Sequence, residues 1–201
     1  MLLMPFTASA HEHASYVIAG TTYNFVIGSQ NEPIAVDDKT GLDLAVTKGV
    51  GATPVTGLEE TLKVELVAGK ERKSIALKPS WGHEGVYEAA FYPTKATTFG
   101  YRLTGTIEGN PVDLTFTCTP GGEKAKNATE AKEIAPGVTQ ISLSGSFGCP
   151  VAKENLGFPE KSASIDSLIK KADAGTMKEN AALALGAIAL VVAVVAMRRK
   201  R

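Results

Sequence analysis

Residues 99–118 read Phe-Gly-Tyr-Arg-Leu-Thr-Gly-Thr-Ile-Glu-Gly-Asn-Pro-Val-Asp-Leu-Thr-Phe-Thr-Cys. Apolar and polar side chains alternate from Phe99 to Leu103 and again from Val112 to Phe116, which is the period of a strand with one buried face. The intervening Glu108-Gly109-Asn110 has the composition of a turn. The stretch therefore predicts a β-hairpin whose core-facing phase includes Cys118.

The same alternation recurs from Tyr23 up to this hairpin, without a long amphipathic helix that would favour a βαβ unit. Its members are Tyr23, Phe25 and Ile27; Leu42, Leu44 and Val46; Leu62, Val64 and Leu66; Ile75 and Leu77; and Tyr87, Ala89 and Phe91. About seven short strands separated by turn residues are typical of an antiparallel sandwich. We therefore expect an all-β, immunoglobulin-like antiparallel β-sandwich over residues 11–118.

Residues 119–150 follow as a polar loop up to Pro136 and one more strand, Val138–Phe147. Cys118 and Cys149 are the two cysteines of the chain. They fit one disulfide in an oxidising compartment, which would clip the added strand to the sandwich, and two free thiols are the alternative. Such a bridge contributes about 3–4 kcal/mol in the chain-entropy description.

The C-terminal segment 180–201 contains an unbroken apolar run, Ala181–Met197, followed by Arg198-Arg199-Lys200-Arg201. About 17 residues in a helix span roughly 25 Å, the lower limit for crossing a bilayer. We expect a single transmembrane helix in the cell membrane, with its basic end in the cytoplasm; a buried core helix is the alternative. Residues 151–179 are then a tether with a short amphipathic juxtamembrane helix, marked by Ile165, Leu168, Ile169 and Ala172.

Residues 1–10 resemble the end of a secretory signal peptide, because a short apolar stretch precedes the small residues Ala8-Ser9-Ala10. Together with the C-terminal anchor, this predicts an extracytoplasmic domain, extracellular or periplasmic. In such a compartment Asn127-Ala128-Thr129 is a glycosylation sequon if the host glycosylates exported proteins.

Composition excludes several classes of function. Lys plus Arg and Asp plus Glu number 21 each, and four of the positive charges lie in the tail, so the exported part is mildly acidic. This gives no indication of a nucleic-acid partner. Three histidines and the absence of a glycine-rich phosphate loop leave little for catalysis, and we expect that the protein is not an enzyme.

Two of the three histidines, His11 and His13, directly follow the predicted cleavage site. Cleavage after Ala10 would give a free amine that could bind copper(II) together with the His13 imidazole and two amides, or with the His11 imidazole alone. The alternative is a frayed N-terminus without metal. His83, in a glycine-flanked turn with Trp81, is a further candidate ligand or simply an exposed loop residue.

Short motifs between residues 31 and 109 carry a resemblance to a known family. They are Asn31-Glu32-Pro33, Gly41-Leu42-Asp43-Leu44, Gly57-Leu58-Glu59, Leu62-Lys63-Val64, Gly85–Thr94 and Gly105–Gly109. With them the chain resembles exported bacterial and archaeal proteins whose immunoglobulin-like domain is similar in style to YtkA-like and FixH-like domains and, distantly, to CopC-type copper carriers. The resemblance covers about residues 23–117 and implies an anchored sandwich associated with copper handling.

These observations predict a membrane-anchored extracytoplasmic binding module, in copper handling or as accessory to a membrane copper enzyme. Its expected partners are membrane lipid, through the C-terminal helix, and a membrane protein complex that meets the face carrying Trp81 and His83. The alternative is a purely structural or adhesive cell-surface domain without metal.

Overall fold

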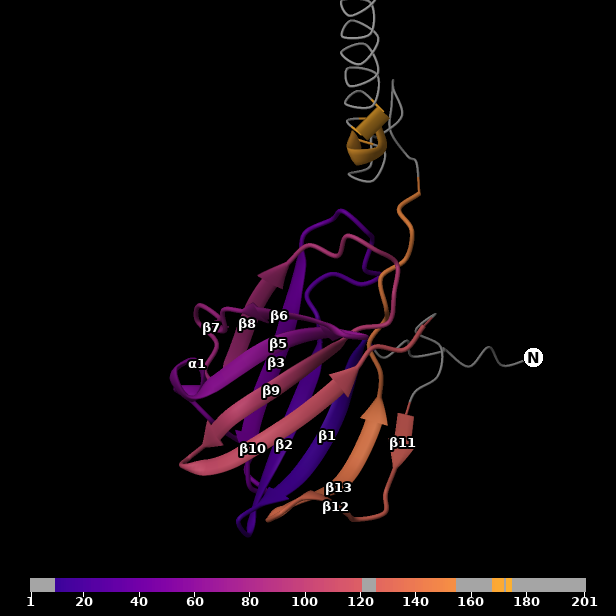
Figure 1. Ribbon diagram of the computed structural model, residues 1–201. Coiled ribbons are helices and arrows are strands. Elements are labelled where there is room, and N and C mark those ends of the chain that lie inside the picture. Colours follow the sequence, from indigo (N-terminus) through magenta and orange to yellow (C-terminus); the bar gives the residue numbers. More distant parts are fainter. Residues whose placement is uncertain (1–9, 121–125, 155–167, 172, 175–201) are drawn as a thin grey trace, which may run out of the picture. The chain divides into compact units, whose positions relative to one another are not determined.

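The computed structural model describes residues 10–120, 126–154, 168–171 and 173–174 (Figure 1). The chain divides into two units, Met1–Lys153 and Glu154–Arg201. The first unit is built from two antiparallel sheets that share one hydrophobic core, so the predicted all-β fold is confirmed.

Within the described residues, the larger sheet has nine strands. Its main path is β11-β13-β1-β2-β3-β8-β7, with β12 paired to β13 and β4 paired to β3. The strands are β1 (His11–Ile18), β2 (Thr21–Ser29), β3 (Thr40–Lys48), β4 (Thr53–Pro54), β7 (Lys78–Pro79), β8 (Val86–Phe91), β11 (Lys126–Ala128), β12 (Lys132–Ala135) and β13 (Val138–Gly145).

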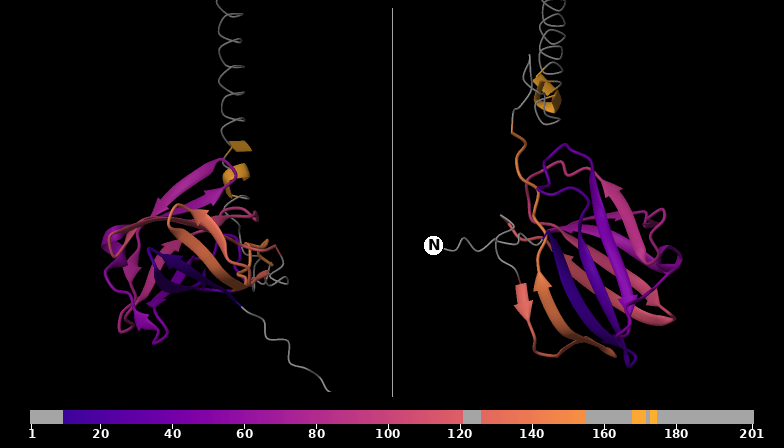
Figure 2. Two further views of the ribbon diagram at one scale, coloured as in Figure 1. Left: turned by 90° about the horizontal axis from the view of Figure 1, so that it is seen from below. Right: turned by 180° about the vertical axis from the view of Figure 1, so that it is seen from behind.

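The smaller sheet has the order β10-β9-β5-β6 and covers one face of the larger sheet. Its strands are β5 (Leu62–Ala68), β6 (Glu71–Ile75), β9 (Gly100–Ile107) and β10 (Asn110–Thr117), and a single helical turn, α1 (Leu58–Thr61), precedes β5. The smaller sheet lies nearer the viewer in Figure 1, and the larger sheet lies nearer in the right-hand view of Figure 2. The larger sheet therefore keeps an outer face.

The predicted hairpin of residues 99–118 forms as β9 and β10. Its turn is made by Glu108 and Gly109, whose φ angles of 48° and 82° are both positive, as a two-residue hairpin loop with strand-like twist requires. The turn also joins the two sheets, because Glu108 accepts a 2.7 Å hydrogen bond from the hydroxyl of Tyr23 on β2 and pairs with Lys48.

Aromatic side chains from both sheets fill the core. The rings of Phe25 on β2 and Phe116 on β10 lie with centroids 6.0 Å apart, and Tyr16 on β1 meets both of them edge-on. A second aromatic group consists of Phe91, Phe99, Tyr101 and Phe147. Burial of this apolar surface is the main attraction between the sheets.

The predicted disulfide is confirmed: Cys118 and Cys149 are bonded, with Cα atoms 5.0 Å apart. The segment after β13 is also held by backbone hydrogen bonds. Cys149 N–H donates to Thr119, and Val151 N–H donates to Ile34 on the connection between β2 and β3. The end of the described domain is therefore fastened to both sheets.

Several expectations need correction. His11–Ile18 is a regular strand, β1, with partners on both sides, so the frayed N-terminus is wrong for these residues. The polar stretch before Pro136 is not only loop, because β11 and β12 pair there with β13. These strands could not be predicted from local composition, because neither is longer than four residues and both lie at a sheet edge.

The predicted membrane segment, 180–201, lies outside the described residues, as do residues 1–9. Among the residues that the structure describes, no helix is long and apolar enough to cross a membrane. Within the predicted juxtamembrane helix, residues 168–171 and 173–174 are helical.

Candidate functional site

A row of outward-facing residues crosses the larger sheet at the start of β1. Successive strands place His11 opposite Gly28, Gly28 opposite Asp43, and Asp43 opposite Glu88. The residues one position further along β1, β2, β3 and β8 are core-facing, so the side chains of this row lie on the outer face. The row brings together residues from four strands and from distant parts of the chain.

His11 reaches over β2 to Asp43. The Nε2 atom of His11 lies 3.2 Å from Oδ2 of Asp43, and the two side chains are 30% and 40% exposed. Gly28 makes this possible, because a Cβ atom at that position would lie 2.6 Å from Cδ2 of His11. Because residue 28 has no side chain, the imidazole of His11 can lie directly against the sheet there.

The surroundings of His11 favour its charged form. The hydrogen bond to Asp43 raises the pKa of His11, burial opposes this, and the charges of Asp43 and Glu32 add to the increase. Burial raises the pKa of Glu32, while hydrogen bonds from the Gly148 and Ser29 backbone and the His11 charge oppose that shift. The start of β1 is thus an acidic, partly enclosed corner built around one imidazole.

The other half of the row is a hydrogen-bonded carboxylate. Glu88 accepts from Gln30 Nε2 at 2.9 Å and from Ser80 Oγ at 2.6 Å. Gln30 lies over Gly41, where an added Cβ would be 2.5 Å from Oε1 of Gln30. Two glycines in neighbouring strands therefore give room to two polar side chains that lie flat on the sheet.

His13 lies two residues further along β1, on the same outer face as His11, and is exposed. Its neighbours across the sheet are Val26 on β2 and Ser144 on β13. Both candidate histidines at the N-terminus are therefore displayed by one strand, but in different rows.

A four-nitrogen copper site through the amides of residues 12 and 13 conflicts with this strand. The register pairs Glu12 with Ile27 on one side and with Gly145 on the other, and Glu12 is only 3% exposed. Bending two deprotonated amides around an ion would remove ladder hydrogen bonds and draw Glu12 out of the core. The expected arrangement through His13 therefore does not fit the folded strand.

Side chains alone do not form a metal centre in the described part of the chain, where no three His, Cys, Asp or Glu side chains are grouped to hold an ion. The other expected arrangement, an α-amine with the His11 imidazole, needs only one side chain and leaves the ladder intact. A carboxylate that holds the second ring nitrogen of a metal-bound histidine is a common arrangement in proteins, and Asp43 is placed to do so. In a chain that begins at His11, these two nitrogen donors would suit copper(II).

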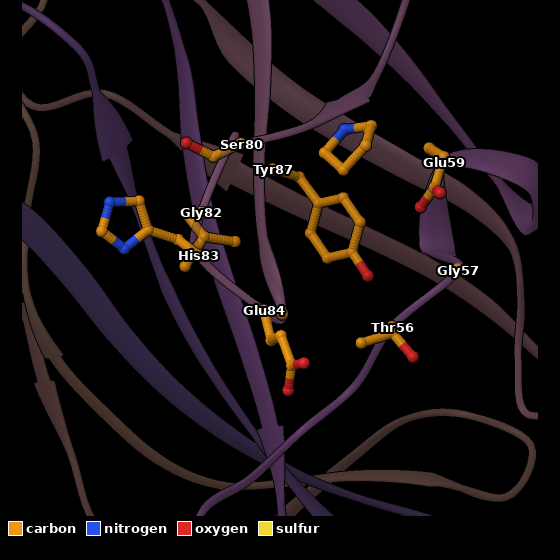
Figure 3. Close-up of a pocket in the computed structure, with 11 residues that line it drawn as sticks. Thr56, Gly57, Glu59, Ser80, Gly82, His83, Glu84 and Tyr87 are labelled. Carbon is orange, nitrogen blue, oxygen red and sulfur yellow. The ribbon is translucent and has the colours of Figure 1, made fainter.

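His83 lies elsewhere, in the loop between β7 and β8. It lines a pocket of about 380 Å³ together with Thr56, Gly57, Glu59, Pro79, Ser80, Gly82, Glu84, Gly85, Val86 and Tyr87. Figure 3 shows the imidazole of His83 pointing away from the side on which Thr56, Glu59 and Glu84 lie. A common ligand role for His83 and the N-terminal histidines gains no support from this placement.

The remaining predicted site residue, Asn127, lies on β11, where its neighbour across the sheet is Ser144. Asn127 is exposed, so the sequon is on the surface.

Asp43, Gly28 and Glu88 were not predicted as site residues. The signal available in the sequence was the alternation of inward and outward positions along each strand. Asp43 lies between Leu42 and Leu44, so it must face outward, and Gly28 lies at an outward position of its own strand. The sequence does not say which outward residues share a row, because that depends on strand order.

Comparison with known protein families, with curated proteins and with solved structures finds no match.

Proposed function

We propose that this protein is a membrane-anchored extracytoplasmic binding module that holds copper(II) at the N-terminal end of β1 and is not an enzyme. The observation that carries the proposal is the His11 imidazole, which lies over Gly28 with Nε2 at 3.2 Å from Asp43. His11 directly follows a plausible cleavage site, and cleavage there would supply its α-amine as a second nitrogen donor.

We further propose that the domain is immunoglobulin-like. The chain crosses between the sheets after β4, after β6, after β8 and after β10, which places β2, β3 and β8 in the sheet opposite β5, β6, β9 and β10. Seven strands divided in this way follow the Greek-key connections of immunoglobulin-like sandwiches. Strands β1 and β13 then extend the first sheet beyond that unit.

The ligands in this proposal are the α-amine and Nδ1 of His11. Asp43 keeps Nε2 engaged and so fixes the orientation of the ring, and Glu32 adds negative charge to the corner. A bound copper(II) ion would supply an exchangeable charged centre for carriage or delivery, since it prefers nitrogen donors in tetragonal sites. Binding requires loss of protons from the amine and the imidazole, so it weakens as the pH falls.

The proposal is tested first by N-terminal sequencing of the exported full-length protein, which should begin at His11. Copper(II) titration in detergent, followed by calorimetry and electron paramagnetic resonance, should then give one site per chain. One extra residue before His11 should abolish copper binding at this site, because the α-amine then lies farther from the imidazole. A different first residue, or equal binding by the extended variant, would overturn the proposal.

Two variants separate the possible donor sets. His13→Ala should leave the copper affinity nearly unchanged, whereas an amide site through residue 13 would lose it. Asp43→Asn should weaken binding about 10-fold, as loss of a carboxylate that orients a metal-bound histidine does. Asp113→Asn, on the smaller sheet, is the matched control and should bind copper as the parent does.

Membrane anchoring has its own test. Protease added outside intact cells should remove the domain and spare the tail at 198–201, and a protected domain would refute the orientation. The alternative role, a structural or adhesive surface domain, predicts no copper binding by the mature chain and only envelope polymers as partners.

A further inference from the structure

The loop between β7 and β8 is held in one conformation by its own hydrogen bonds. The N–H of Ser80 donates to the carbonyl of Val86 at 2.8 Å, and that of His83 donates to Ser80 at 3.3 Å. The Ser80 hydroxyl donates to Glu88, and Gly85 packs so closely on Pro54 that a Cβ there would lie 2.9 Å away. The loop is therefore ordered before any partner binds.

Trp81 projects from this loop and is 96% exposed. It is the one tryptophan of the chain. A tryptophan side chain is usually well buried, since its large apolar surface is unfavourable in water. Exposed on an ordered loop, it has the properties of a binding anchor, because aromatic residues on preorganised surfaces contribute most to protein interfaces.

The pocket next to Trp81 is acidic. Glu59 and Glu84 line it, and none of the described residues that line it is Lys or Arg. The Oε2 atom of Glu59 is shielded from solvent and has no hydrogen-bond partner within the described structure. Figure 3 shows the Glu84 and Thr56 side chains below the Tyr87 ring, Glu59 to its right, and the His83 ring on the other side. The net negative charge of the lining favours a ligand with positively charged N–H donors.

We propose that Trp81 and the Glu59–Glu84 pocket form a docking site for a basic segment of a partner protein, with an arginine or lysine side chain entering the pocket. An arginine suits the pocket best, because its planar guanidinium N–H groups bond a carboxylate, while the exposed indole of Trp81 offers a stacking face to a neighbouring side chain of the segment. A polysaccharide would need aromatic stacking but not the two carboxylates, so the charge favours a basic protein segment.

This inference rests on the proposed function only in taking the domain to be a binding module. It does not involve His11, Asp43 or copper. The chain could bind the basic segment without binding copper, or bind copper without binding the basic segment. The two proposals can therefore fail independently.

Trp81 fluorescence provides the test, because this single tryptophan reports on the loop alone. The full-length protein in detergent is titrated with a tetra-arginine amide peptide. We expect a saturable change in emission that weakens with added salt, since the contact is charged. Glu84→Gln should weaken the apparent affinity roughly two- to five-fold, as the loss of an exposed ion pair does. Glu59→Gln removes the second carboxylate of the lining and should weaken it too.

Glu71→Gln is the matched control, because it removes the same charge from the exposed face of β6. It should bind the peptide like the parent protein, and tetra-glutamate should give no change. Absence of a saturable change, or equal weakening in the Glu71 and Glu84 variants, would overturn the proposal. A response to a neutral glucose tetrasaccharide but not to tetra-arginine would overturn it in favour of a carbohydrate ligand.

Discussion

The imidazole of His11 and the carboxylate of Asp43 are joined at 3.2 Å across an intervening strand, because Gly28 between them has no side chain. Cross-strand contacts normally join residues on adjacent strands. Here the contact ties the start of β1 to β3, two strands away in the sheet. The N-terminal histidine is thus part of the sheet surface, and this relation can be tested by substitution.

Gly28→Ala should displace the His11 ring. An added Cβ would lie 2.6 Å from Cδ2 and 2.9 Å from Cγ of His11, so the ring would have to leave its place over β2. We expect a loss of about 1–3 kcal/mol in the free energy of unfolding, measured in urea, as for other overpacked sites. Gly51→Ala is the control, since a Cβ there meets nothing within 4 Å. Equal stability of the two variants would contradict the predicted close packing.

Asp43→Asn should lower the pKa of His11, because the hydrogen bond to Asp43 is the main cause of its increase. A histidine with a raised folded-state pKa contributes stability that is complete below about 6.5 and is lost as the pH rises through the folded value. The stability difference between the parent and Asp43→Asn should therefore shrink between pH 6 and 8. Partial exposure keeps the effect below about 1 kcal/mol.

The measurement is a set of urea unfolding curves across this pH range, combined with NMR titration of the His11 ring. Glu32 also has a raised pKa, which lowers stability as the pH rises above its ordinary value of 4.5. Both proteins keep Glu32, so its contribution is common to the two sets of curves. A His11 pKa that is the same in both proteins would contradict the assignment.

Cys149→Ser should cost about 3–4 kcal/mol in the free energy of unfolding, as expected for a loop of this length. Because Cys118 and Cys149 are bonded, alkylation of the unfolded chain without reductant should label neither. Hydrogen exchange in the variant should increase at residues 147–151 more than in β13. The reason is that β13 stays paired with β1 along its length. Faster exchange throughout β13 would show that the disulfide, rather than the ladder, holds this strand.

Glu108→Gln should reduce the loss of stability in acid. Hydrogen bonds from Lys48 and then from Tyr23 lower the pKa of Glu108. An acid with a lowered folded-state pKa contributes stability that is present above its ordinary value of 4.5 and is lost as the pH falls through the folded value. The parent should therefore lose more stability than Glu108→Gln between pH 6 and 3. Glu130→Gln, at an exposed position, should behave like the parent.

The sequence by itself determined the core strands between Tyr23 and Phe116 and their inward faces. Alternation from Tyr23 to Phe116 is a local property, because successive side chains of a strand point to opposite sides. The pairing of Cys118 with Cys149 could also be predicted, since the chain has two cysteines. Strand β1 escaped prediction although His11, His13 and Ser15 alternate with buried residues, because Glu12 breaks the apolar phase.

The tertiary structure decided which outward residues meet. Phase places Asp43 and His11 on outer faces, but only the strand order β1-β2-β3-β8 puts them in one row with Glu88. Likewise, Trp81 is visible in the sequence, whereas the acidic pocket beside it depends on α1 and β8 coming together from residues about 30 positions apart. Strand order and loop packing are set by the whole core, so no local window of sequence contains them.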